Sequence, residues 1–147
     1  MWERTLGTVV AAAMMAAAAQ ASDRQVVRGR YLVENVAMCG DCHTPRGAMG
    51  QPDLAKPLAG MVLEFRPTSM VPDWAEEAPG IAGPQARGWT RVQMVRFLKT
   101  GERPDGSFAR PPMPMVRMTQ DDAEAVAAYL ASLPAPIAPV PTKAGAR

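Results

Sequence analysis

Apolar residues recur with helical spacing in three stretches of the chain. One apolar stripe runs along residues 24–38, a second along residues 91–100 and a third, rich in alanine, along residues 120–132. Gly29 lies within the first stretch, where the absence of a side chain would allow a second helix to approach closely. The pattern therefore predicts three main helices and an all-α fold.

Local signals mark the boundaries of the second and third helices. Thr90 and Thr119 each begin a capping-box pattern, in which a threonine and the residue three positions later exchange hydrogen bonds with the backbone. Gly101 follows the second apolar stretch and Pro134 follows the third. We therefore expect these helices to begin and end close to these four residues.

The stretch from residue 44 to residue 88 has no sustained apolar period. Prolines and glycines interrupt it throughout. An irregular segment of this length is unusual in a compact domain unless it wraps around something. Three helices and so much loop also leave little core, and such chains usually rely on disulfides, a metal or a large cofactor.

The N-terminus reads as an export signal over residues 1–21. Arg4 precedes an uncharged, alanine-rich run, and the small residues Ala19 and Ala21 predict cleavage before Ser22. The run is too short for an ordinary membrane span, which leaves an uncleaved anchor as the alternative. We predict a periplasmic protein with one domain over residues 22–133 and a flexible, proline-rich tail over residues 134–147.

Composition narrows the chemistry. The 147 residues carry 16 basic and 14 acidic side chains, a balance that excludes a strongly basic nucleic-acid-binding protein. One histidine and two cysteines exclude a two-histidine metal site and a four-cysteine zinc or iron–sulfur site within this chain. The three scarce residues, Cys39, Cys42 and His43, are close neighbours.

Cys39, Cys42 and His43 fit the C-x-x-C-H signature of c-type haem attachment. The two thiols would form thioethers with the haem vinyl groups, and His43 would be the proximal iron ligand. A disulfide within this short segment would stabilise the fold very little. A thioredoxin-like motif normally follows a strand, and no strand pattern precedes Cys39. The sequence therefore predicts one covalent haem c.

Methionine is the natural sixth ligand because the chain has no second histidine. Residues 110–118 form a proline-rich segment just before the third helix, and prolines on both sides of Met113 restrict its backbone. Met113 is our first candidate, with Met118 and Met115 as alternatives. An open sixth site, suited to peroxide or nitrogen-oxide chemistry, is the competing hypothesis, although no spare histidine is present to act as an acid or base.

From about residue 27 to residue 134 the chain resembles a class I, monohaem cytochrome c. Residues 29–32 are similar to the glycine and aromatic of the family's first helix, and residues 128–130 to the last helix that packs on it. Met113 also precedes Thr119 by the spacing found between the methionine ligand and the last helix cap in small bacterial members. The resemblance implies a small cytochrome c fold, with about three main helices and long loops around one haem, and an electron carrier rather than an enzyme.

A narrower likeness links the chain to cytochrome domains of periplasmic alcohol, gluconate and molybdenum-hydroxylase-type dehydrogenases. It rests on residues 42–46, 58–60, 88–90, 97–101, 105–106 and 111–114. The likeness implies a dehydrogenase as electron donor, a downstream cytochrome, oxidase or quinone-linked acceptor, and membrane association, if any, through a partner. Residues 61–87 match no part of that pattern, and within them Trp74 is expected either to cover the haem or to contact a partner.

Several basic side chains flank the predicted haem segments in the sequence. They would either steer an acidic partner, neutralise the haem propionates or form ordinary surface charge. The side chains concerned are Arg46, Arg87, Arg91, Arg96, Lys99, Arg103, Arg110 and Arg117.

Overall fold

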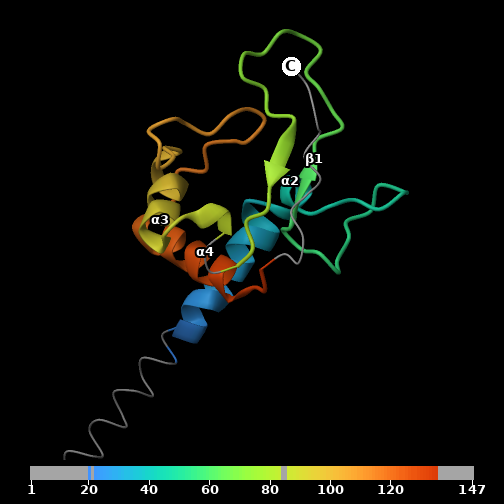
Figure 1. Ribbon diagram of the computed structural model, residues 1–147. Coiled ribbons are helices and arrows are strands. Elements are labelled where there is room, and N and C mark those ends of the chain that lie inside the picture. The colour runs from blue at the N-terminus through green and yellow to red at the C-terminus, as the bar shows by residue number, and fades with distance from the viewer. Residues whose placement is uncertain (1–19, 21, 84–85, 136–147) are drawn as a thin grey trace, which may run out of the picture.

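The computed structural model describes residues 20, 22–83 and 86–135, and these residues form a mostly helical fold (Figure 1). Residues 22–31 are α-helical. The elements that follow are η1 (Leu32–Val36, a π-helix), α2 (Gly40–His43), β1 (Gly60–Val62), β2 (Glu77–Pro79), η2 (Ala86–Gly88, a 3₁₀-helix), α3 (Arg91–Thr100) and α4 (Gln120–Ser132). The three predicted helices are present, and the fold agrees with the all-α prediction apart from a small sheet.

The predicted signal segment and tail lie outside the described residues, apart from residues 20, 134 and 135. Both therefore stay predictions. In the part of the chain that the structure describes, no helix combines the length and the apolar character needed to cross a membrane.

The helix over residues 22–31 crosses α4 at close range. A Cβ atom on Gly29 would overlap the Ala125 carbonyl oxygen and would come within 2.8 Å of Tyr129 Cβ. Arg28 forms an ion pair with Asp122 at 3.0 Å on one side of this crossing. The close helix contact predicted from Gly29 is therefore confirmed, and its partner is α4.

The first helix widens before the predicted haem motif. Residues 24–38 were predicted as one α-helix, but the α-helix ends at residue 31 and continues as the π-helical turn η1. The Ala37 N–H donates to the Leu32 carbonyl at 2.8 Å, and the Cys39 N–H donates to the Val33 carbonyl at 3.0 Å. This wider turn leads the chain directly into α2.

The predicted caps form in full on α3 and in part on α4. Both hydrogen bonds of the capping box link Thr90 and Gln93, and Gly101 ends α3 with φ 73° in the left-handed region that favours glycine. At α4 the Thr119 side chain accepts from the Asp122 N–H, so one direction of the predicted box is present. The Asp122 carboxylate pairs with Arg28 instead of returning to the cap.

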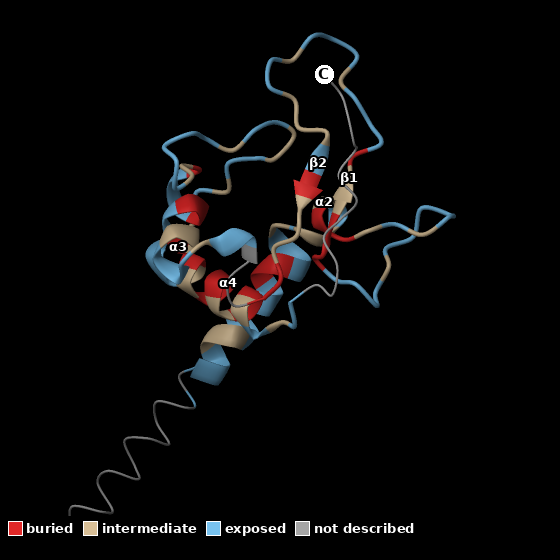
Figure 2. Ribbon diagram, viewed as in Figure 1, coloured by how far each residue is buried: buried red, intermediate tan, exposed pale blue. Residues whose placement is uncertain are grey.

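The hydrophobic core lies where α3, α4 and the end of the first helix meet, and buried residues concentrate there in Figure 2. Val33 and Val126 are its largest fully buried side chains. The larger core members, such as Leu98 and Tyr129, keep a few per cent of their surface exposed. Its members are Leu32, Val33, Leu58, Ala82, Val95, Leu98, Ala123, Val126, Ala127, Tyr129 and Leu130.

The segment predicted to be irregular contains a short antiparallel pair of strands, which we call the β1–β2 hairpin (residues 60–79). Gly60 pairs with Pro79 and Val62 with Glu77. Residues 63–76 form a long loop that projects from the two strands (Figure 1, green). Strands of three residues that contain glycine and proline give no alternating pattern, so the sequence offered no sign of them.

Candidate haem site

The structure places Cys39, Cys42 and His43 on one turn of helix. Cys39 is the N-cap of α2, and the His43 N–H donates to the Cys39 carbonyl at 2.9 Å. Both cysteines are half-buried free thiols. The predicted motif is therefore compact, with its two sulfur atoms and its imidazole carried by five consecutive residues.

The His43 ring is held by a contact that the sequence analysis did not predict. The ring is only 6% exposed, and its Nδ1 lies 2.7 Å from the carbonyl oxygen of Pro79, the last residue of β2. Because a carbonyl only accepts hydrogen bonds, Nδ1 carries the proton and Nε2 keeps its lone pair. This is the orientation that metal-ligating histidines commonly show.

The electrostatic surroundings keep His43 neutral. Burial lowers the pKa of His43, the hydrogen bond to Pro79 partly opposes this shift, and the positive charge of Arg87 lowers it further. A neutral imidazole is the form that binds a metal. The side chain is thus oriented and protonated as an iron ligand requires.

Two side chains, Thr44 and Arg46, connect the C-x-x-C-H motif to the loop that follows it. The Thr44 hydroxyl, in a buried position, accepts a hydrogen bond from the Leu58 N–H at 3.0 Å. The Arg46 guanidinium donates to the Asp41 carbonyl at 2.9 Å and to the Gly50 carbonyl at 3.0 Å. The backbone around His43 is therefore braced from both sides.

The cysteine environment disfavours thiol–disulfide chemistry. Burial raises the pKa of the Cys39 thiol, and the nearby Cys42 adds to the effect, while a hydrogen bond to the backbone opposes it. A catalytic thiol in a C-x-x-C motif needs the opposite shift, because the thiolate is the nucleophile. The thioredoxin-like alternative is therefore unsupported by the structure.

The three methionines proposed as sixth ligands have different surroundings in the α3–α4 loop. Met113 is half-buried, and its N–H donates to the Arg110 carbonyl at 3.0 Å. Met115 is 46% exposed and lies over Gly101. Met118 packs against the hydrophobic core, and its N–H donates to the Leu98 carbonyl at 3.0 Å. Met115 and Met118 thus have structural roles of their own.

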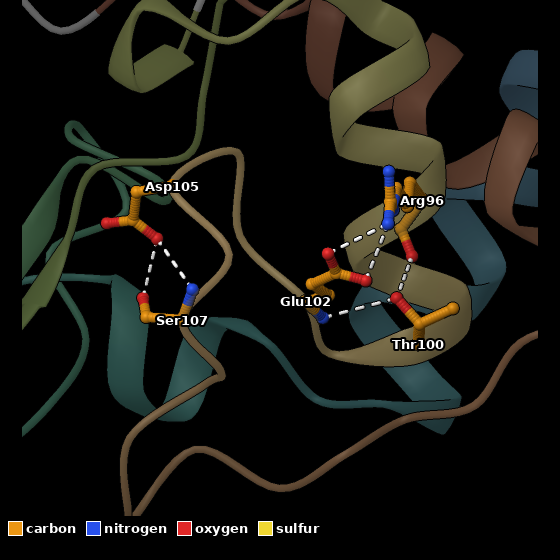
Figure 3. A network of polar contacts seen from close by, with 5 residues as sticks. All are labelled: Arg96, Thr100, Glu102, Asp105 and Ser107. Atoms are coloured by element: carbon orange, nitrogen blue, oxygen red, sulfur yellow. Dashed lines mark hydrogen bonds and ion pairs between the residues drawn. The ribbon is translucent and has the colours of Figure 1, made fainter.

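A polar network stabilises the beginning of the α3–α4 loop (Figure 3). The Arg96 guanidinium contacts both carboxylate oxygens of Glu102 at 2.7 and 2.8 Å, and the Glu102 N–H donates to the Thr100 hydroxyl. Asp105 accepts from the Ser107 hydroxyl at 2.6 Å and from its N–H, and these bonds lower the pKa of Asp105. The segment that leads to Met113 is therefore ordered by its own side chains.

Comparison with known proteins identifies the family. The family model described as "Cytochrome c" matches residues 26–134. The chain belongs to the cytochrome c family. The resemblance to cytochrome c is thereby confirmed, together with the small cytochrome c fold that it implied, whereas the single haem stays a prediction. Covalently bound haem c is the cofactor that membership of this family implies.

Several curated relatives share about a third of their aligned residues with this cytochrome c. A diheme cytochrome c-type of Cereibacter sphaeroides is 34% identical, over 74% of this chain and 35% of the relative. The cytochrome subunit of fructose dehydrogenase of Gluconobacter japonicus is 32% identical, over 74% and 22%. The cytochrome c subunit of a quinone alcohol dehydrogenase of Gluconobacter oxydans is 36% identical, over 78% and 25%. The matched part is thus about a third of these relatives or less.

Two of these relatives are named as cytochrome subunits of dehydrogenases. A further relative, the cytochrome c subunit of gluconate 2-dehydrogenase of Pantoea cypripedii, is 33% identical over 76% of this chain and 26% of the relative. The narrower likeness to dehydrogenase cytochromes is therefore confirmed. The expectation of an electron-transfer protein rests on these relatives.

Two arginines of this cytochrome c fit the acidic edge of a haem. The Arg87 guanidinium lies 4.6 Å from the centre of the Trp89 ring, and desolvation, followed by the positive charge of Arg103, lowers the pKa of Arg87. The buried Nε atom of Arg103 has no hydrogen-bond partner among the described residues. The carboxylate of Asp105 opposes the lowering of the Arg87 pKa, so the cluster already contains one anion, and the unpaired Arg103 donor is the feature that would suit a further anionic group such as a propionate.

Most of the other basic side chains named from the sequence are engaged within the chain. Arg46 and Arg110 donate to backbone carbonyls, and Arg96 pairs with Glu102. Arg91 donates to Gln25, and Lys99 donates to Gln120. Among these five residues only Arg96 is paired with a carboxylate in the described part of the chain, so steering of an acidic partner by the others stays a prediction.

Sequence reasoning missed the residues that act through their backbone. The Pro79 carbonyl that accepts from His43 is the clearest case. Every residue carries a carbonyl, so residue type gives no signal for this contact. Thr44 was within reach of prediction, because it directly follows the motif and its hydroxyl is able to accept a hydrogen bond.

Proposed function

We propose that this protein is a one-electron carrier with a single haem c, bound covalently by Cys39 and Cys42 and ligated by His43 and Met113. The observation that carries the proposal is the buried His43 ring beside the two thiols, with Nδ1 occupied by Pro79 and Nε2 left as the ligand atom. When bound, haem c supplies a reversible one-electron change between iron(III) and iron(II). The four named residues would hold the haem and shield its iron from water.

Met113 is the sixth ligand that the surroundings favour. Its two competitors, Met115 and Met118, are engaged with Gly101 and with the core. Met113 stands between two prolines and is half-buried. The prolines restrict the backbone on both sides, and this limits the positions that the Met113 sulfur can reach. Neutral histidine and thioether ligands favour the reduced state, which suits a carrier that accepts the electrons released when a dehydrogenase oxidises its substrate.

We further propose that the electron donor is a dehydrogenase and that the acceptor is a cytochrome, an oxidase or a quinone-linked protein of the respiratory chain. The donor is supported by the relatives, which are cytochrome subunits of alcohol, fructose and gluconate dehydrogenases. A periplasmic location follows from the predicted signal over residues 1–21, with the domain over residues 22–133 and a tail over residues 134–147.

Spectroscopy of the matured protein tests the ligand set. Haem absorbance that stays with the chain after denaturation and acid extraction would establish covalent attachment. The weak far-red band of sulfur-to-iron(III) ligation should be present in the wild type and in Met115→Ala and Met118→Ala, and absent in Met113→Ala. The two other methionine variants are matched controls, because they change the same loop.

The competing open-site hypothesis gives a different result. A wild-type protein without the far-red band, whose ferrous form binds CO rapidly, would overturn the Met113 proposal. Loss of the band in Met118→Ala or Met115→Ala, but not in Met113→Ala, would move the ligand to that residue.

The donor is tested by reduction of the oxidised cytochrome. Membranes of the source organism would be supplied in turn with ethanol, fructose and gluconate, and the haem absorbance followed. Substrate-dependent reduction would identify the class of dehydrogenase. If none of these three substrates led to reduction of the haem, this part of the proposal would be contradicted.

A further inference from the structure

The β1–β2 hairpin touches both segments that carry the proposed iron ligands. At its end, the Pro79 carbonyl accepts from His43 Nδ1 at 2.7 Å. Within its loop, the Asp73 and Trp74 carbonyls accept from the Arg110 guanidinium, and the Ala75 N–H donates to the Pro111 carbonyl at 2.7 Å. One continuous segment therefore links α2 to the loop that contains Met113.

Arg110 is the centre of the second contact. Its Nε donates to the Asp73 carbonyl at 2.9 Å and its Nη2 to the Trp74 carbonyl at 3.1 Å, so one planar group grips two successive peptides. Asp73 has φ 55°, in the left-handed region, where aspartate is one of the few residues besides glycine to be found. A bidentate contact is able to hold this local conformation in place.

The hairpin is braced at its base, so it offers a firm support. The Leu63 N–H donates to the Glu76 carbonyl at 2.8 Å, whereas the exposed ion pair between Arg66 and Glu76 adds little stability. Trp74 packs edge to face on Phe65, with 5.9 Å between the ring centres, and its buried Nε1 has no partner among the described residues. The loop that receives Arg110 is thus tied back onto its own strands.

The backbone of Arg110, unlike its side chain, contacts Met113. The Arg110 carbonyl accepts from the Met113 N–H at 3.0 Å, so the residue closes a turn on the proposed ligand through its backbone and grips the hairpin through its side chain. Because the sixth ligand must stay within bonding distance of the iron, a loosened turn would let an external ligand compete with the sulfur.

We propose that Arg110 is a positioning residue, which fastens the Met113 turn to the β1–β2 hairpin and keeps the methionine sulfur on the iron. This inference rests on the proposed function, in which Met113 is the sixth ligand.

The test compares ferric holoprotein variants in an imidazole titration, with the far-red sulfur band as a second readout. Two hydrogen bonds of ordinary strength are lost in Arg110→Ala, so imidazole should bind roughly tenfold more tightly. The far-red band should weaken or become temperature-sensitive. Arg110→Lys keeps one cationic donor and should recover part of the wild-type resistance to imidazole.

Arg66→Ala is the matched control. It removes an arginine of the same hairpin that pairs with Glu76 and not with the Met113 segment. Its imidazole affinity and its far-red band should equal those of the wild type. An equal effect of Arg66→Ala and Arg110→Ala would overturn the inference, because the effect would then come from general loosening of the loop.

The outcomes separate the two proposals. A wild-type far-red band together with an Arg110→Ala protein that binds imidazole as weakly as the wild type would refute the positioning role and leave Met113 ligation intact. A wild type with no far-red band would refute Met113 ligation itself. If Arg110→Ala does not fold, Arg110→Gln, which keeps a neutral donor, is titrated in its place with the same expected direction.

Discussion

Replacing Gly29 with alanine should destabilise the protein, although alanine is the better helix former. Gly29 lies inside the helix over residues 22–31, where alanine would by itself add up to about 1 kcal/mol of stability. The new Cβ atom, however, would overlap the Ala125 carbonyl and lie 2.8 Å from Tyr129 Cβ. Carbon atoms in contact prefer about 3.5 to 4.0 Å, so the two helices must move apart by roughly 1 Å.

The separation has consequences beyond the crossing point. Overpacking of this kind costs about 1 to 3 kcal/mol. The same movement would lengthen the 3.0 Å pair between Arg28 and Asp122 and the 2.6 Å hydrogen bond between Tyr129 and Glu34. Weakening of these two contacts offsets the gain in helix propensity, so we expect a net loss of about 1 to 3 kcal/mol in the free energy of unfolding.

Chemical denaturation of the holoprotein, followed by far-ultraviolet circular dichroism and by haem absorbance, measures this loss. Arg24→Ala is the control, since it also adds an alanine to the helix over residues 22–31 but at an exposed position. The control should be at least as stable as the wild type to within about 0.5 kcal/mol. A Gly29→Ala protein as stable as the wild type would show that the helices do not cross as closely as described.

Two further predictions concern single hydrogen bonds. Tyr129→Phe removes the 2.6 Å bond from the Tyr129 hydroxyl to Glu34 and should lower the free energy of unfolding by about 1 to 2 kcal/mol. Burial, followed by the bond to Glu34, raises the pKa of Tyr129 to about 12 from its ordinary value near 10. Because the folded-state pKa is the higher one, this stabilisation is complete below pH 10 and disappears as the pH rises from about 10 to 12. The stability difference between wild type and Tyr129→Phe should therefore shrink over that range, and a difference that stays constant would contradict the assignment. Thr44→Val removes the acceptor for the buried Leu58 N–H and should cost about 1 to 3 kcal/mol in a denaturant titration, whereas Thr44→Ser should restore most of it. Equal stability of the valine and serine variants would rule out the hydrogen bond as the cause.

The sequence was most informative where local chemistry decides the structure. Thr90 and Gly101 marked the limits of α3 because caps act within one turn of the residues that form them. Gly29 indicated a helix crossing because glycine destabilises the interior of a helix, so its presence there favours a close contact that a side chain would block. The C-x-x-C-H motif was equally local, since its three functional side chains lie on one short helix.

Contacts between distant segments were beyond the sequence. Asp122 was expected to complete a capping box, but Arg28, 94 positions earlier, takes its carboxylate. The hydrogen bond from Arg110 to Asp73 spans 37 positions, and its acceptor is a backbone carbonyl. Every residue has such a carbonyl, so the residue type gives no signal for the contact. The prolines around Met113 singled it out, yet only the folded chain shows that Met118 packs in the core. The iron ligands themselves stay predictions until spectroscopy tests them.

The π-helical turn η1 has a consequence for how the length of this chain may vary. A π turn holds one residue more than the α turn it replaces, so η1 acts as a one-residue insertion placed seven residues or fewer before Cys39. Deleting one residue within Leu32–Val36 would let the α-helix continue unbroken, and the helix itself would tolerate the change. The motif that follows would nevertheless be turned about the helix axis relative to Pro79. Deletions between Arg28 and the motif should therefore be disruptive, because they rotate either Gly29 away from α4 or the motif away from Pro79.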